Sequence, residues 1–145
     1  MRVRVLLFVV SAAVLGFAPA PLPKRERQGE HPNDLTGVWR FVRCETNGVL
    51  DDPSTFTNYR IEIRDTEIHF MPNGERRGGV KMVLDPKASP PSFTWSLEGR
   101  VYCVGSYRLV RGELTMVFAV GSRLEDRPKD LTNGPHRYVL RRVSR

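Results

Sequence analysis

The sequence VYCVGSYRLVRGELTMVFAVG, residues 101–121, carries the pattern that decides the fold. Apolar residues occupy alternate positions on both sides of a turn at Arg111-Gly112. The residues that share one parity are Val101, Cys103, Gly105, Tyr107 and Leu109 before the turn, and Leu114, Met116, Phe118 and Val120 after it. Alternation with a period of two around a glycine-containing turn is typical of a β-hairpin. We therefore expect an antiparallel hairpin with one face turned toward a hydrophobic core.

The same alternation recurs along the chain, between turn signals such as Asn47-Gly48 and Asn73-Gly74. The expected strands are residues 38–45, 56–64, 67–71, 80–84, 92–97, the two strands of the hairpin, and 136–143. No segment has a convincing helical period. We predict an all-β, antiparallel, up-and-down barrel of about eight strands. Closing such a sheet on itself leaves no strand edge exposed.

Residues 1–20 have the layout of a secretory signal peptide. Arg2 and Arg4 give the positive start, residues 5–17 form an uncharged apolar run, and the segment ends in small residues at 18–20. A membrane-spanning helix needs about 20 apolar residues, and this run is shorter. We therefore expect cleavage and export to the periplasm, the cell envelope or the extracellular space, with no membrane span in the mature protein.

The remaining chain is expected to hold a disordered polar leader over residues 21–33 and one barrel domain over 34–145. The whole chain has a formal net charge of +7. Two of its 23 basic residues and none of its 16 acidic residues lie in 1–20, so cleavage leaves a charge of +5. Many arginines alternate with apolar residues on expected strands. They predict either a solvated outer face or weak attraction to an anionic envelope polymer. No basic groove interleaved with aromatic residues is present, so nucleic-acid binding is not predicted.

Several short stretches resemble a known family. The Gly37-Val38-Trp39 stretch looks like the Gly-x-Trp that opens lipocalin-type barrels. Further matching stretches are Leu35 to Trp39, Leu84-Asp85-Pro86 followed by Pro90, Gly105 to Leu109 with Gly112-Glu113-Leu114, Arg127-Pro128, Leu140-Arg141-Arg142, and APAPLPK at 18–24. In this order and spacing, the chain resembles a family of uncharacterised exported planctomycete proteins with a lipocalin-like domain. The resemblance covers residues 34–143 and implies a lipocalin-like barrel, but no established activity.

Aromatic side chains are expected to face the barrel interior. The candidate ligand-binding residues among them are Trp39, Phe41, Tyr59, Phe70, Trp95, Tyr107, Phe118 and Tyr138. In an eight-stranded barrel such residues either fill the interior as a core or line a pocket for a small, partly apolar molecule. An apolar cavity of roughly 300 Å³ or more, open to solvent, would distinguish the two.

Gly37, Trp39 and Arg142 are the expected structural residues at one end of the barrel. Closure requires residues 136–143 to run antiparallel beside residues 38–45, which brings Arg142 beside Trp39. Parity turns both side chains inward, so the guanidinium group can stack on the indole ring. Lipocalin-type barrels are known for such an arginine–tryptophan pair, and the resemblance strengthens this prediction.

Catalytic and metal sites are not indicated. His31, His69 and His136 are the only histidines, and none has a partner at metal-ligand spacing. We expect His69 to face solvent, because it alternates with apolar neighbours. A triad of Ser96 or Ser106 with His136 lacks any nucleophile-elbow signature. The sequence therefore predicts no enzyme activity, no metal and no cofactor.

The two cysteines, Cys44 and Cys103, are expected to be unpaired. An oxidising compartment would favour a disulfide. However, their strands are three apart in a simple barrel, about 14 Å along the wall at roughly 4.8 Å per strand. A disulfide needs Cα atoms within about 7 Å. Parity also turns Cys44 outward and Cys103 inward.

Two functions remain open from the sequence. The first is an exported, non-enzymatic domain that binds a small, partly apolar molecule in the barrel. The second is a cell-envelope interaction module with a filled barrel, which uses its basic outer face and loops.

Overall fold

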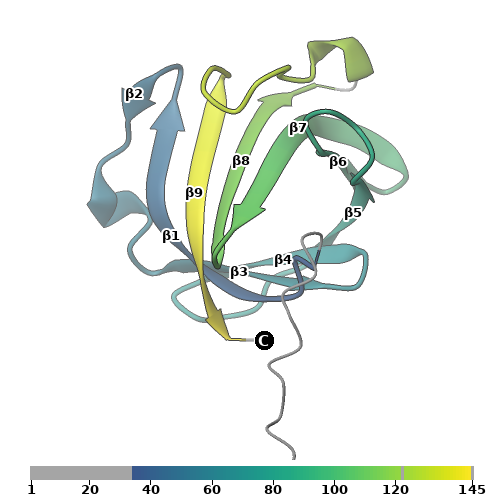
Figure 1. The fold of residues 1–145 in the computed structure, drawn as a ribbon. Coiled ribbons are helices and arrows are strands. Elements are labelled where there is room, and N and C mark those ends of the chain that lie inside the picture. The colour runs from purple at the N-terminus through teal and green to yellow at the C-terminus, as the bar shows by residue number, and fades with distance from the viewer. Residues whose placement is uncertain (1–33, 122, 145) are drawn as a thin grey trace, which may run out of the picture.

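The computed structural model describes residues 34–121 and 123–144, which form nine strands and two 3-10 turns (Figure 1). The predicted signal peptide (1–20) and leader (21–33) lie outside the described residues. The elements are β1 (Gly37–Thr46), β2 (Val49–Leu50), η1 (Pro53–Thr55), β3 (Tyr59–Arg64), β4 (Glu67–Pro72), β5 (Gly79–Asp85), β6 (Ser92–Leu97), β7 (Arg100–Val110), β8 (Glu113–Val120), η2 (Leu124–Asp126) and β9 (His136–Ser144). Within the described chain, neither η1 nor η2 is long and apolar enough to cross a membrane.

The sheet closes on itself. Its strand order is β2-β1-β3-β4-β5-β6-β7-β8-β9, every pairing is antiparallel, and β1 also pairs with β9. The strands β1 and β3 to β9 therefore form a closed eight-stranded barrel, and the short β2 extends the sheet beside the end of β1 (Figure 1). The predicted all-β, antiparallel, lipocalin-like barrel is confirmed.

The hairpin predicted within residues 101–121 is formed by β7 and β8. Arg111 and Gly112 make the turn, with φ values of 49° and 77°. Two successive residues at positive φ give a turn whose twist matches that of the strands it joins. Tyr107 pairs with Met116, and both are almost fully buried in the barrel.

The opposite face of this hairpin is buried as well. Ser106 and Val117 both have 0 % exposure, because the long connection from β8 to β9 covers them. The Ser106 hydroxyl donates a hydrogen bond of 2.7 Å to the Pro128 carbonyl oxygen. A Cβ atom at Gly134 would lie only 2.4 Å from Cγ1 of Val117. The sequence predicted one buried face, and the connecting loop adds a second.

A bulge in β1 changes the direction of its last residues. Phe41 pairs with Leu140 and Arg43 with Val139, so Val42 is the extra residue. The bulge turns Cys44 inward, where it is 5 % exposed. The expectation that Cys44 faces outward is wrong, because a bulge shifts the alternation of every residue after it.

A second irregularity lies between β6 and β7. Trp95 pairs with Cys103, but the next residue of β6 pairs with Val101, which leaves Tyr102 as the extra residue. Tyr102, not Val101, packs against the core, and its ring centroid lies 6.4 Å from that of Trp95. Val120 at the end of β8 is 69 % exposed. The inward prediction is therefore wrong for Val101, whereas Val120 pairs with Cys103 and keeps the inward parity, exposed at the end of β8.

The end of the barrel near Trp39 is closed by the segment before β1. The guanidinium carbon of Arg142 lies 4.5 Å from the centroid of the Trp39 ring, as predicted. Arg142 also donates hydrogen bonds to the carbonyl oxygens of Thr36 (2.7 Å) and Asp34 (2.6 Å). The Trp39 indole N–H donates to the carbonyl oxygen of Leu35 at 2.8 Å, and Leu35 is 2 % exposed. Residues 34–36 thus form a plug across this end of the barrel, and Arg142 holds the plug in place.

Gly37 connects that plug to β1. Its φ of 131° lies in a region that L side chains rarely adopt. The glycine of the Gly-x-Trp stretch is therefore required by the backbone where the chain turns into the first strand.

The interior above the plug is filled with side chains. Gly105 marks how tight the packing is, because a Cβ atom there would lie 2.4 Å from the Phe93 ring. The buried core consists of Leu35, Trp39, Ile61, Ile63, Ile68, Val80, Met82, Phe93, Trp95, Cys103, Tyr107, Leu114, Met116, Phe118 and Leu140. These side chains leave no room for a ligand among themselves, so a ligand site inside the barrel is sought at its opposite end.

Candidate ligand pocket at the barrel mouth

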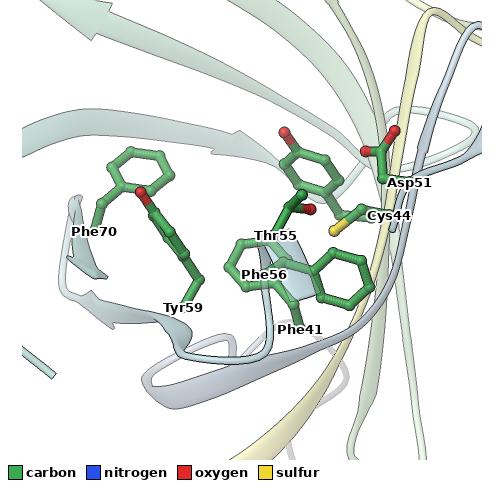
Figure 2. Close-up of a pocket in the computed structure, with 8 residues that line it drawn as sticks. Phe41, Cys44, Asp51, Thr55, Phe56, Tyr59 and Phe70 are labelled. Carbon is green, nitrogen blue, oxygen red and sulfur yellow. The ribbon is translucent and has the colours of Figure 1, made fainter. Parts of the chain in front are cut away.

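A pocket of about 230 Å³ opens to solvent at the end of the barrel opposite the plug (Figure 2). Its lining consists of Phe41, Cys44, Asp51, Thr55, Phe56, Tyr59, Phe70 and Tyr138. The volume is below the roughly 300 Å³ expected of a hollow barrel that holds a drug-sized ligand. In the part of the chain that the structure describes, core side chains therefore fill most of the barrel, and this cavity lies at its mouth.

Strands β1 and β9 build one wall of the pocket. The Phe41 and Tyr138 rings meet edge to face, with centroids 5.2 Å apart and planes at 82°. Cys44 pairs directly with Tyr138 and faces the same side, because of the bulge at Val42. The bulge thus adds a thiol to a wall that would otherwise be aromatic.

The turn η1 builds a second wall. Asp52 caps this turn by accepting a hydrogen bond of 2.9 Å from the Ser54 backbone N–H. Pro53 occupies the first position, where its fixed φ suits a helical turn. The turn brings Thr55 and Phe56 over the mouth, between Tyr59 and Cys44 as seen in Figure 2.

Asp51 supplies a carboxylate at the edge of the pocket. Its backbone N–H donates a hydrogen bond of 2.9 Å to the Cys44 carbonyl oxygen, which fixes this segment beside β1. Its carboxylate accepts one hydrogen bond, of 3.3 Å, from the Thr46 hydroxyl. Figure 2 shows Asp51 beside Cys44, across the pocket from Phe70.

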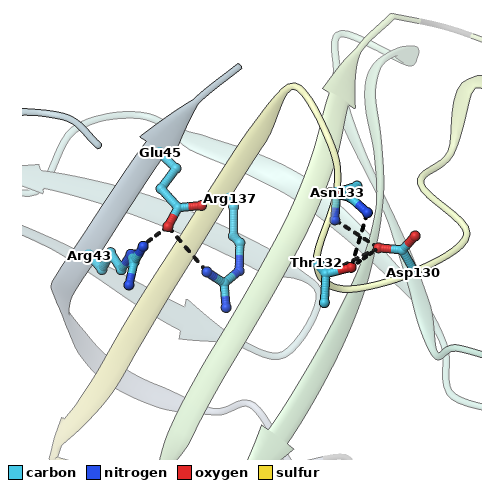
Figure 3. A network of polar contacts seen from close by, with 6 residues as sticks. All are labelled: Arg43, Glu45, Asp130, Thr132, Asn133 and Arg137. Carbon is cyan, nitrogen blue, oxygen red and sulfur yellow. Dashed lines mark hydrogen bonds and ion pairs between the residues drawn. The ribbon is translucent and has the colours of Figure 1, made fainter. Parts of the chain in front are cut away.

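The arginines on the outer side of the same wall bind another carboxylate. Arg43 and Arg137 both form ion pairs with Glu45, the latter at 3.2 Å (Figure 3). Among the described residues, Asp51 therefore has no basic partner. Its charge is available to the pocket.

The thiol and phenol of the wall stay protonated at neutral pH. Burial raises the pKa of Cys44 to about 12, and the negative charge of Asp51 adds to the shift. Burial likewise raises the pKa of Tyr138 to about 12, with contributions from Cys44, Asp51 and Cys103. Both groups are therefore neutral, and the Asp51 carboxylate is the one formal charge in the lining.

The eight predicted lining residues divide into two sets. Phe41, Tyr59, Phe70 and Tyr138 line the pocket. Trp39, Trp95, Tyr107 and Phe118 are packed in the core and do not border it. Two of these core residues support the lining from behind: the Trp95 ring lies 6.0 Å from that of Phe70, and the Phe118 ring lies 4.9 Å from that of Tyr138, centroid to centroid. Four of the eight candidates therefore border the cavity, and four pack in the core.

The sequence analysis missed Cys44, Asp51, Thr55 and Phe56. A strand is expected from residue 56, whereas η1 occupies 53–55 and β3 begins at Tyr59. A signal was present in Asp52-Pro53, since aspartate as N-cap followed by proline marks the start of a helical turn. For Cys44 the sequence gives no comparable signal.

His69 is buried, contrary to the expectation that it faces solvent. Its side chain is turned away from the core, but it is only 9 % exposed. Its ring lies against Gly79 on the neighbouring strand, where a Cβ atom would come within 2.4 Å of Cε1. Its Nε2 atom lies 3.1 Å from the Glu67 carboxylate. The prediction is wrong because glycine leaves room for the ring.

The histidine and serine that were considered for a catalytic triad make packing and hydrogen-bond contacts instead. His136 stacks on Phe118 with centroids 5.1 Å apart, and the Ser106 hydroxyl is bound to a loop carbonyl. Within residues 34–121 and 123–144, no three His, Cys, Asp or Glu residues come together to hold a metal ion. His31 lies outside the described residues.

Cys44 and Cys103 are both free and buried. Burial raises the pKa of Cys103 to about 12, as it does for Cys44. The thiolate is the reactive form of cysteine, so neither thiol is a good nucleophile at neutral pH.

No family model, curated protein or solved structure matches this chain. The resemblance to exported lipocalin-like planctomycete proteins therefore stays a prediction, and the function must be argued from the pocket itself.

Proposed function

We propose that the protein binds a small, partly apolar molecule in the mouth pocket and catalyses no reaction. The observation that carries this proposal is the open cavity of about 230 Å³, lined by five aromatic side chains, a carboxylate, a hydroxyl and a thiol. Concave sites with mostly apolar walls and a few polar groups are typical of small-molecule binding. The setting we propose, on the sequence of residues 1–20, is the periplasm, the envelope or the extracellular space.

The size of the cavity limits the ligand. A cavity of about 150 Å³ holds benzene, whereas drug-sized ligands occupy about 300 Å³ or more. A volume of about 230 Å³ suits one ring with a short polar substituent. The ligand we propose is therefore a single-ring molecule or an aliphatic molecule of similar volume.

Calorimetric titration of the full chain with three single-ring probes tests the proposal. The probes are 2-phenylethanol, 2-phenylethylammonium and 3-phenylpropionate, and we expect at least one to bind. Thr55→Trp should abolish that binding, because the indole would fill the pocket from η1. Thr57→Trp is the matched control: both threonine hydroxyls bind carbonyl oxygens of the same turn, but Thr57 does not line this pocket. The proposal fails if no probe binds or if Thr55→Trp binds as well as the unaltered protein.

A second candidate function has an observation of its own. Arg108, Arg111 and Arg141 surround a shallow surface hollow of about 500 Å³ at the closed end of β7 and β8, together with Val110 and Glu113. Clustered arginines attract anionic polymers in a salt-dependent way. This basic hollow supports the alternative of an envelope interaction module.

Retention on a sulfated polysaccharide column tests this alternative. Replacing the three arginines of the hollow by glutamine should lower the salt concentration needed for elution. Replacing Arg60, Arg64 and Arg123 by glutamine removes the same charge from other surfaces and serves as the control. Equal elution of the two triple variants would rule the basic hollow out as a specific site.

A further inference from the structure

The lining of the mouth pocket has the opposite charge from the chain as a whole. The protein has 23 basic and 16 acidic residues and a net charge of +7. Among the described residues that line the pocket there is one carboxylate, Asp51, and no lysine, arginine or histidine. A ligand in this pocket therefore meets a local negative charge in a basic protein.

The Asp51 carboxylate has spare capacity to accept hydrogen bonds. An ionised carboxylate offers about four acceptor positions. Within the described chain, one hydrogen bond to this carboxylate is defined, from the Thr46 hydroxyl at 3.3 Å. The neighbouring Arg43 and Arg137 pair with Glu45 instead of Asp51. The hydrogen bond from the Asp51 backbone N–H to Cys44 holds the residue at the pocket wall. A donor on the ligand would complete its coordination.

The aromatic walls favour the same charge. Phe41, Phe56, Tyr59, Phe70 and Tyr138 surround the cavity. The faces of aromatic rings are electron-rich, and they attract ammonium groups that come within about 6 Å of a ring centroid. An anionic ligand would instead face the Asp51 carboxylate with no basic side chain in the lining to offset the repulsion.

Resting on the binding function proposed above, we propose that the ligand is a small organic cation: an ammonium compound with one ring or a short alkyl group. Its ammonium group pairs with Asp51, and its apolar part lies between Phe41, Phe70 and Tyr138.

The charge series of probes tests this inference with the full chain at neutral pH and low salt. The probes 2-phenylethylammonium, 2-phenylethanol and 3-phenylpropionate have similar size and differ in charge. We expect the ammonium probe to bind at least about tenfold more tightly than the alcohol, and the carboxylate probe to bind most weakly. This comparison needs no altered protein, so it does not depend on how a variant folds.

Asp51→Asn then tests the role of the carboxylate. The asparagine amide oxygen can still accept the bond from Thr46, so the fold should be kept. Affinity for the ammonium probe should fall roughly tenfold, while affinity for the alcohol should change less than about twofold. Glu113→Gln is the control: it removes one negative charge from the closed end of β8, outside the pocket, and should leave both affinities unchanged.

The outcomes separate this inference from the proposed function. If none of the three probes binds, both are overturned. If the alcohol or the carboxylate probe binds as tightly as the ammonium probe, the binding function stands and the cation preference is overturned. A preference for the ammonium probe that persists in Asp51→Asn overturns the assignment of Asp51 as the counter-ion.

Discussion

At the scale of single residues, the side chain of Arg142 joins the last strand to the closed end of the barrel. It stacks on Trp39 and binds two carbonyl oxygens of the plug segment. Its neighbour Arg141 points outward and pairs with Glu113 at 3.6 Å, with 55 % of its side chain exposed. Replacing each of the two arginines by alanine therefore compares an arginine that binds the plug with an exposed arginine on the same strand.

We predict that Arg142→Ala lowers the free energy of unfolding by about 3 kcal/mol, since it removes two charge-assisted hydrogen bonds and a cation–π contact. Arg141→Ala should cost less than about 0.5 kcal/mol, because exposed ion pairs contribute little. Urea unfolding midpoints of the two variants measure the difference. Equal midpoints would mean that Arg142 does not hold the plug.

The buried thiols predict how stability depends on pH. An unfolded thiol loses its proton near pH 9.0, whereas Cys103 and Cys44 keep theirs to about pH 12 when folded. Between these values the unfolded chain binds fewer protons, so stability is full below pH 9 and falls as pH rises toward 12. Each thiol contributes at most about 1.4 kcal/mol per pH unit to this loss.

Urea unfolding at pH 8, 9.5 and 11 measures this slope, and Cys103→Ala provides the comparison. The cavity that this variant creates costs about the same at every pH, so only the slope should change. We expect a shallower loss of stability above pH 9 in the variant. Parallel curves for the two proteins would contradict the role given to Cys103.

At the scale of elements, the strands were predictable and their irregularities were not. Alternation of apolar residues found every barrel strand, and the Arg111-Gly112 turn was read correctly. The bulges at Val42 and Tyr102 leave no mark in that alternation. Each shifts the register by one residue, which reverses inside and outside for the residues beyond it. This is why the orientations of Cys44 and Val101 were wrong.

The packing of β6, β7 and β8 predicts a strong difference between two glycines. Gly105→Ala should destabilise the protein by about 1–3 kcal/mol, because the new methyl group would meet the Phe93 ring at 2.4 Å. Gly78→Ala is the control, since nothing lies within 4 Å of the corresponding position and its backbone is not in the left-handed region. Thermal unfolding of both variants checks this. A Gly105→Ala protein as stable as Gly78→Ala would show that the core tolerates more volume than the structure implies.

At the scale of the whole molecule, closure of the barrel explains what could be predicted of its two ends. Closure places the end of the last strand beside the start of the first, so the contact of Arg142 with Trp39 followed from topology and parity. The mouth has no such constraint. The walls of the mouth depend on η1 and on the bulge in β1. Because alternation predicts neither of these features, the positions of Asp51 and Phe56 in the pocket lining could not be predicted.

The division into a filled body and an open mouth also explains why only half of the predicted aromatic lining borders the pocket. Parity tells which side chains face the interior, but not how deep in the barrel they lie or whether neighbours cover them. Trp39 and Tyr107 face inward as predicted and are fully packed. Tyr59 and Phe70 lie nearer the mouth and meet the cavity.

Nuclear magnetic resonance of the ¹⁵N-labelled full chain, titrated with 2-phenylethylammonium, tests the ligand pocket most directly. The account predicts saturable shifts of the backbone amides of Cys44, Asp51, Thr55, Phe56 and Tyr59, with the amides of Leu35 and Arg142 at the closed end unchanged. Shifts that cluster at the plug or at the basic hollow would contradict the assignment of the barrel mouth as the binding site, and no shifts at millimolar probe would contradict the binding of a small organic cation there.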